Sequence, residues 1–110
     1  MAFDDQLAQR VRDVLEDVPD VSERRMFGGL AFLVGGHMAC GIVGSDMMLR
    51  LGEAGADAAL ERPHVRPMDF TGRPMRTMVY IAAEGIVADP ALKGWVERSV
   101  DYVNALPRKT

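Results

Sequence analysis

Few side chains in this sequence have the type and spacing that chemistry requires. The chain contains two histidines, His37 and His64, and one cysteine, Cys40. A metal site usually shows a second ligand at a set spacing, such as another histidine three or four residues away, and neither histidine has one. A nucleophilic cysteine needs a thiolate beside a base, whereas Cys40 lies in an apolar run. We therefore expect no metal, no cofactor and no catalytic residue.

Arginines are concentrated in the segment from residue 62 to residue 76. Arg62, Arg66, Arg73 and Arg76 stand there against one acid, Asp69, which gives the segment a local charge of +3. Such a segment could contact an anionic ligand or a nucleic-acid backbone. It could equally pair with the first 23 residues, whose local charge is −5, or hold Asp69 by a forked contact. We favour the structural interpretation, and the net charge of −3 also argues against a broad duplex-binding surface.

The helices that would position these groups are predicted by apolar spacing. Apolar residues three or four positions apart predict a first helix over residues 3–17, ended by Pro19. An alanine-rich stretch predicts a second helix over residues 53–62. Asp89 is predicted to be an N-cap, followed by Pro90 at the first helical position, and the helix that follows should end at Pro107. Its buried stripe is predicted at Leu92, Trp95, Val96, Ser99, Val103 and Leu106.

Two turns predict a pair of hairpins between residues 30 and 51. Gly35-Gly36 suits a type I′ turn, which needs positive φ at both positions, and Gly44-Ser45 can close the second hairpin. If both loops hold two residues, Phe32 faces Ala39 across the first hairpin. This register places an entirely apolar set on the face toward the helices: Ala31, Leu33, Met38, Cys40, Ile42, Met47, Leu49 and Leu51.

The opposite face of the sheet is mixed in character. Together with a strand predicted at residues 77–82, it carries Phe32, Val34, His37, Met48, Arg50, Met78 and Tyr80. A large apolar surface that stays exposed marks an interaction site, and flexible methionines suit adaptable contacts. The alternative is that the proline-rich segment 63–74 covers these side chains. Both interpretations are open from the sequence alone.

Together these elements predict an α+β fold in a single domain, residues 1–110. An edge strand at residues 65–70 completes the order α-β-β-β-α-β-β-α. Because hairpin-linked strands pair antiparallel, we expect a two-layer structure in which helices cover mainly one face of an antiparallel sheet of about five strands. A length of 110 residues leaves no room for a second domain.

The composition is that of an ordinary globular protein, with 48% hydrophobic and 26% charged residues. The amino terminus is acidic and has no apolar core segment, so it does not resemble a signal peptide. Glycines and His37 interrupt the apolar stretch from Met26 to Val43, which argues against a membrane span. A lone cysteine suits a reducing compartment, so we expect a cytoplasmic protein without membrane contact.

Several motifs, taken in order, resemble the N-terminal domain of the TfoX/Sxy family. The first is Arg25-Met26-Phe27-Gly28-Gly29, followed by a hydrophobic hairpin with Met38-Ala39 and the strand Met48-Leu49-Arg50-Leu51. The next is Arg66-Pro67-Met68-Asp69-Phe70-Thr71-Gly72-Arg73-Pro74-Met75, and Trp95 in the closing helix also fits. The resemblance spans about residues 5–106.

This resemblance implies an antiparallel sheet with helices, similar to type III secretion chaperones, and supplies no established catalytic residues. Family members with a further C-terminal domain regulate natural competence in bacteria, together with a cyclic-AMP receptor protein. We expect this chain to stand alone, without that second domain. We also expect a structural role for the motif residues Arg25, Met26, Phe27, Gly28, Gly29, Pro67, Met68, Asp69, Phe70 and Gly72.

The functional hypothesis is a non-enzymatic regulatory module that binds a protein partner or forms a homodimer through the mixed sheet face. One alternative is contact with nucleic acid through Arg62, Arg66, Arg73 and Arg76. Another is the binding of a small ligand near His37, Arg50 and Tyr80.

Overall fold

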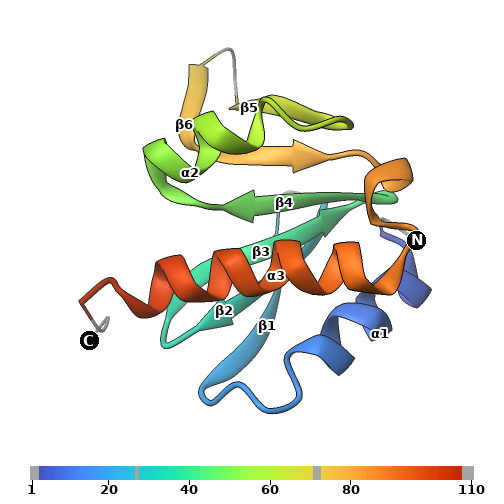
Figure 1. The fold of residues 1–110 in the computed structure, drawn as a ribbon. Helices are drawn as coiled ribbons and strands as arrows, with labels where there is room; N and C mark the ends of the chain where they lie inside the picture. The colour runs from blue at the N-terminus through green and yellow to red at the C-terminus, as the bar shows by residue number, and fades with distance from the viewer. Residues whose placement is uncertain (1–2, 27, 71–72, 108–110) are drawn as a thin grey trace.

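The computed structural model describes residues 3–26, 28–70 and 73–107, in which helices lie at both ends and between two groups of strands (Figure 1). The side chains of residues 69, 70 and 73–75 lie outside this description. The helices are α1 (Asp5–Val14), α2 (Gly52–Ala59), the short 3₁₀ helix η1 (Ala83–Ile86) and α3 (Asp89–Asn104). The strands are β1 (Val21–Met26), β2 (Gly29–Val34), β3 (His37–Val43), β4 (Asp46–Arg50), β5 (Val65–Phe70) and β6 (Arg73–Ile81).

The strands form one antiparallel sheet in the order β1-β2-β3-β4-β6-β5. α3 runs across one face of this sheet, with α1 on one side of it and α2 on the other (Figure 1). Buried side chains of all three helices join those of the strands in one main core. The predicted α+β class and the order of elements are therefore confirmed.

The described sheet has six strands, whereas the sequence predicted about five. The additional strand is β1, whose sequence Val-Ser-Glu-Arg-Arg-Met shows no apolar alternation. Five of its six residues are exposed, because β1 lies at the edge of the described sheet and pairs with β2. Its backbone pairing leaves no signal in the pattern of its side chains.

The helices start close to the predicted positions. The Asp4 side chain caps α1 by accepting hydrogen bonds from the amides of Gln6 and Leu7, at 2.9 and 3.2 Å. Pro90 lies in the first turn of α3, but the N-cap is Ala88 and not Asp89 as predicted, because the Asp89 carboxylate accepts hydrogen bonds from Arg10 instead. The predicted buried stripe is confirmed except for Leu106, which lies beyond the helix. Among the residues described, no helix has the length and the apolar run that crossing a membrane would require.

The first hairpin decides which face each side chain of β2 takes. Its turn, Gly35-Gly36, has the predicted positive φ angles of 60° and 86°. Pairing next to the turn follows the prediction, but farther along Phe32 faces Cys40 instead of Ala39. Ala39 is thus an extra residue in β3, and this β-bulge sets two residues of β3 opposite one residue of β2.

The bulge reverses the predicted faces of β2. Phe32 and Val34 are 0% and 4% exposed and pack into the main core under the helices, so their predicted outward placement is wrong. Met38, predicted to face the helices, packs against a second cluster instead. A strand that is apolar on both faces shows the same pattern in either register, and the sequence therefore could not reveal the shift.

That second cluster consists of methionines on the other face of the sheet. Met48 of β4, Met68 of β5 and Met78 of β6 pack together with 1%, 3% and 6% of their surfaces exposed. Met38 and Tyr80 pack against them and are partly buried. Met68 belongs to the proline-rich segment, so this segment covers the methionines of the outer face.

Phe32 and Leu33 test the bulge, since they are neighbours on opposite faces of β2. Phe32→Ala should lower the free energy of unfolding by about 3–5 kcal/mol, because it empties a fully buried site. Leu33→Ala should cost clearly less, because Leu33 is only half-buried. Urea denaturation of both variants measures the two losses. A larger loss for Leu33→Ala would mean that β2 keeps the register without the bulge.

Candidate functional site

The seven residues expected to form one interaction surface do not lie together on an exposed face. Four of them are buried: Phe32, Val34, Met48 and Met78. His37 Nε2 lies 2.6 Å from the carbonyl oxygen of Pro107, just beyond α3. The guanidinium carbon of Arg50 lies 5.9 Å from the centre of the Tyr102 ring on α3. His37 of β3 and Arg50 of β4 therefore connect the sheet to the C-terminal end of α3 and to the residues just beyond it.

The arginines of the segment from residue 62 to residue 76 are separated as well. Arg66 contacts the Asp46 carboxylate at 2.8 Å, and its guanidinium carbon lies 4.7 Å from the centre of the Tyr80 ring. Arg76 lies 3.9 Å from a Glu53 oxygen, and both side chains are exposed. Exposed ion pairs of this kind contribute about 0–1 kcal/mol to stability. Both contacts fit the structural interpretation of these two arginines.

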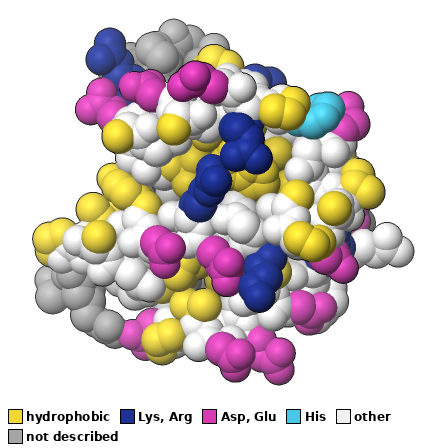
Figure 2. Space-filling view, viewed as in Figure 1, with side chains coloured by type: hydrophobic (Ala, Val, Ile, Leu, Met, Phe, Trp, Pro, Cys, Tyr) yellow, Lys and Arg dark blue, Asp and Glu magenta, His cyan; other side chains and the backbone are white. Residues whose placement is uncertain are grey.

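Arg62 belongs to a different group of charges. Its guanidinium carbon lies 5.6 Å from the centre of the Trp95 ring, and that of Arg98 approaches the same ring at 4.8 Å. Figure 2 shows two basic side chains over hydrophobic surface in the hollow between α2 and α3. The Arg73 side chain lies outside the described residues. Arg62 and Arg98 reach the same ring only after α3 has packed on the sheet, so the sequence did not show that they lie together.

Three of the described motif residues have structural contacts, whereas Met26 is 37% exposed. The guanidinium carbon of Arg25 lies 5.7 Å from the centre of the Phe3 ring. A side-chain carbon on Gly29 would collide with the carbonyl oxygen of Ile42, so only glycine allows β2 and β3 to approach there. Met68 is buried in the methionine cluster. Other parts of the motif lie outside the described residues: Phe27 and Gly72 entirely, and the side chains of Asp69 and Phe70.

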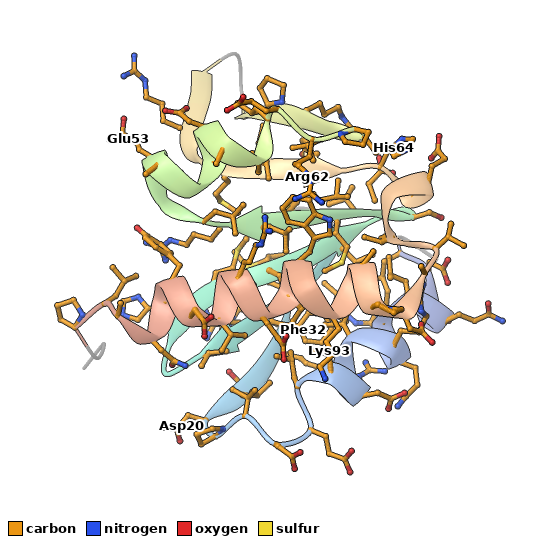
Figure 3. All side chains as sticks on the ribbon, viewed as in Figure 1. Asp20, Phe32, Glu53, Arg62, His64 and Lys93 are labelled. Atoms are coloured by element: carbon orange, nitrogen blue, oxygen red, sulfur yellow. The ribbon has the colours of Figure 1, made fainter. Side chains whose placement is uncertain are left out.

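The cysteine and the histidines do not form a reactive group. Burial raises the pKa of the Cys40 thiol to about 12, although a hydrogen bond with Ser99 opposes the shift. The thiol is therefore protonated at neutral pH. His64 lies near η1 (Figure 3), whereas His37 contacts the chain beyond α3. Within the described ranges, no group of three or more His, Cys, Asp or Glu side chains could hold a metal ion.

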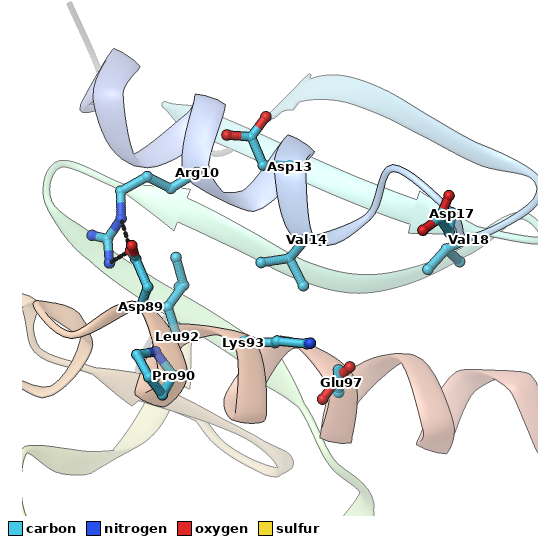
Figure 4. Close-up of a pocket in the computed structure, with 10 residues that line it drawn as sticks. All are labelled: Arg10, Asp13, Val14, Asp17, Val18, Asp89, Pro90, Leu92, Lys93 and Glu97. Atoms are coloured by element: carbon cyan, nitrogen blue, oxygen red, sulfur yellow. Dashed lines mark hydrogen bonds and ion pairs between the residues drawn. The ribbon is translucent and has the colours of Figure 1, made fainter.

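α1 and α3 enclose a cleft that no sequence motif indicated (Figure 4). Its volume is about 790 Å³, and Val14, Val18 and Leu92 supply its apolar lining. A second hollow continues from it along α3, lined by further apolar side chains that include Val96 and Val100. Together the two hollows form one groove between the end of α1 and the exposed flank of α3.

The rim of this groove is acidic. Asp13, Asp17 and Glu97 line the cleft, and Asp101 lines the adjoining hollow. The residues that line the two hollows include two cations, Arg10 and Lys93. Because Arg10 is paired with Asp89, Lys93 alone among these lining residues offsets the four carboxylates. The groove therefore attracts cationic groups and repels anionic ones.

Arg10 closes one end of the cleft. Its Nε and Nη2 atoms donate hydrogen bonds to the Asp89 carboxylate at 3.1 and 3.0 Å (Figure 4). Nη2 also donates to the backbone carbonyl oxygens of Ile86 and Val87, at 2.8 and 3.1 Å. These bonds join α1 to η1 and to the start of α3, so they fix the separation of the two walls.

Part of the acidic rim had a signal in the sequence. Asp13 and Asp17 fall near the carboxyl end of the first helix, where a negative charge opposes the helix macrodipole. Glu97 joins them only through tertiary packing, so the sequence could not show the rim as a whole.

Comparison with known proteins places the chain in a family. The family model of the TfoX N-terminal domain matches residues 13–103. Among solved structures, the chain is similar to the crystal structure of the Deinococcus radiodurans protein DR2400, which carries the family-model domain DUF419. The two are 17% identical with a TM-score of 0.70, over 89% of this chain and 78% of that one, which is a likeness of fold. No curated protein matches the chain.

The buried thiol of Cys40 should make the folded protein less stable at alkaline pH. The pKa of the thiol is about 12 in the folded state against an ordinary 9.0, so above about pH 9 the unfolded state releases the proton first. Stability should therefore fall as the pH rises from about 9 to 12, by up to about 1.4 kcal/mol per pH unit. Cys40→Ala removes this contribution. Urea denaturation at pH 7 and pH 10 should show a larger loss for the wild type, and equal losses would contradict a buried neutral thiol.

Proposed function

This chain belongs to the TfoX N-terminal domain family, and we propose that it is a non-enzymatic regulatory module that binds a protein partner. The resemblance connects the domain with competence regulators, and the proposed role is accordingly regulatory. In this proposal the partner lies in the groove between α1 and α3.

The observation that carries the proposal is the combination of an apolar floor and an acidic rim. Val14 and Val18 are half-buried, so they offer surface to apolar side chains of a partner. The carboxylates of Asp13, Asp17 and Glu97 favour cationic side chains beside them. A segment with apolar residues on one face and Lys or Arg at its margins satisfies both requirements at once. We therefore assign the groove to a basic amphipathic segment of a partner protein.

The length of the groove suits a short helical segment. The cleft and the adjoining hollow share Val14, Val18 and Glu97, and along α3 they extend from Asp89 to Asp101. At the helical rise this stretch of α3 measures about 18 Å, or a little over three turns. An amphipathic helix of similar length can place one apolar residue per turn on the floor.

Other features support binding over catalysis. Cys40, the one thiol in the chain, is buried and protonated. His37 is engaged by the carbonyl oxygen of Pro107. The charged side chains of the groove lie on its rim, and Arg10 is committed to Asp89 and to two backbone carbonyls. The groove thus resembles a contact surface more than a reaction site.

Two alternatives have less support. A homodimer through Phe32 and Met48 would require both side chains to leave their cores. Nucleic-acid contact through Arg66 and Arg76 would compete with the carboxylates of Asp46 and Glu53. A reduced, buried Cys40 fits the cytoplasm, which we propose as the location of the protein.

Reversing the charge of the rim tests the proposed groove. Asp17→Lys combined with Glu97→Lys should weaken partner binding at least tenfold, because each new cation repels a basic segment. Both residues are exposed, so the fold should be retained. The wild type and the double variant, immobilised at equal density, are exposed to lysate of the native host, and quantitative mass spectrometry measures the retained proteins.

The matched control is Glu16→Lys combined with Glu84→Lys, which makes the same charge change at exposed positions outside the groove. The proposal expects a protein retained by the wild type and by the control but lost from the groove variant. Retention of the same proteins by all three chains, or by none, would contradict it.

A further inference from the structure

The two flanks of α3 differ in charge. The flank that faces α1 carries the acidic rim, which includes Glu97. The opposite flank carries Trp95 and Arg98. Arg62, which lies in the segment after α2 (Figure 3), reaches the same indole. Two cations from separate elements thus meet on one aromatic ring in the hollow between α2 and α3 (Figure 2).

Neither of these arginines has an acidic partner among the described residues. Arg10, Arg12 and Arg66 each contact a carboxylate within 3.0 Å, but the described ion pairs include neither Arg62 nor Arg98. Each guanidinium carries five N–H donors, and the described hydrogen bonds of these side chains use none of them. Both residues are exposed, so the donors can be reached from solvent.

Trp95 brings the two guanidinium groups close together. Their carbons lie 5.6 and 4.8 Å from the same ring centre, so they can be no farther apart than about 10.4 Å. Two like charges at this separation repel each other, and a bound anion would offset the repulsion. Trp95 is only 7% exposed, so a ligand entering the hollow would meet the guanidinium groups before the indole.

Phosphate is the anion that fits this arrangement. A guanidinium donates two parallel hydrogen bonds to neighbouring phosphate oxygens, and a phosphate offers enough oxygens for two such groups. We propose that the hollow between α2 and α3 binds a phosphate-bearing ligand through Arg62 and Arg98. A small phosphate compound and a nucleic-acid backbone share this chemistry. The site lies on the opposite flank of α3 from the groove and does not depend on the proposed partner binding.

Trp95 is the one tryptophan in the chain, so its fluorescence reports directly on the two guanidinium groups that contact it. The protein is titrated at low ionic strength with inorganic phosphate, with tripolyphosphate and with a short single-stranded oligothymidylate, and calorimetry repeats each titration. The wild type should show a saturable change. Arg62→Ala and Arg98→Ala should each weaken binding about tenfold, because each removes charge-assisted hydrogen bonds, and the double variant should not bind.

The charge-matched control is Arg24→Ala, on the exposed strand β1, which should bind like the wild type. Tighter binding of the oligonucleotide with a steep salt dependence would identify a nucleic-acid backbone as the source, and binding of tripolyphosphate alone a small phosphate compound. The proposal is overturned if no probe gives either a fluorescence change or heat. It is also overturned if the double variant binds as well as the Arg24→Ala control.

Discussion

The packing of α3 across the sheet is the interaction on which the rest of this structure depends. One side of the helix, from Leu92 to Val103, fills the main core with the strands beneath it. Its two flanks remain available, one toward α1 and the other toward α2 (Figure 1). Successive residues of a helix point about 100° apart, and Glu97 and Arg98 accordingly serve opposite flanks. A single element therefore carries the core and separates two surfaces of opposite charge.

The sequence predicted those parts of the fold that depend on local pattern. The apolar stripe of α3, the Gly35-Gly36 turn and the strand at residues 65–70 all follow from residue type and spacing over a few positions. β1 was missed because its side chains are exposed on both faces. The bulge at Ala39 was missed because β2 is apolar on both faces, so neither register conflicts with the pattern.

The sequence indicated single members of the candidate sites, such as Arg62 as an anion contact, but it could not assemble either site. The groove joins Asp13 and Asp17 to Glu97, and the phosphate site joins Arg62 to Arg98, across long stretches of chain. Such contacts exist only after the helices have packed on the sheet. The motif residues that identify the family lie mostly in strands and turns, where Gly29 and Met68 serve packing. The family resemblance thus indicated the fold and a regulatory role without indicating either site.

α3 separates a negative surface from a positive one, and nuclear magnetic resonance can test this separation of charge without any partner. Paramagnetic relaxation is measured with two small nitroxide solutes, one cationic and one anionic. The cationic solute should relax the amides of residues 13–17 more strongly than the anionic solute does, whereas the anionic solute should relax the indole N–H of Trp95 more strongly. The same preference at both places would contradict the account.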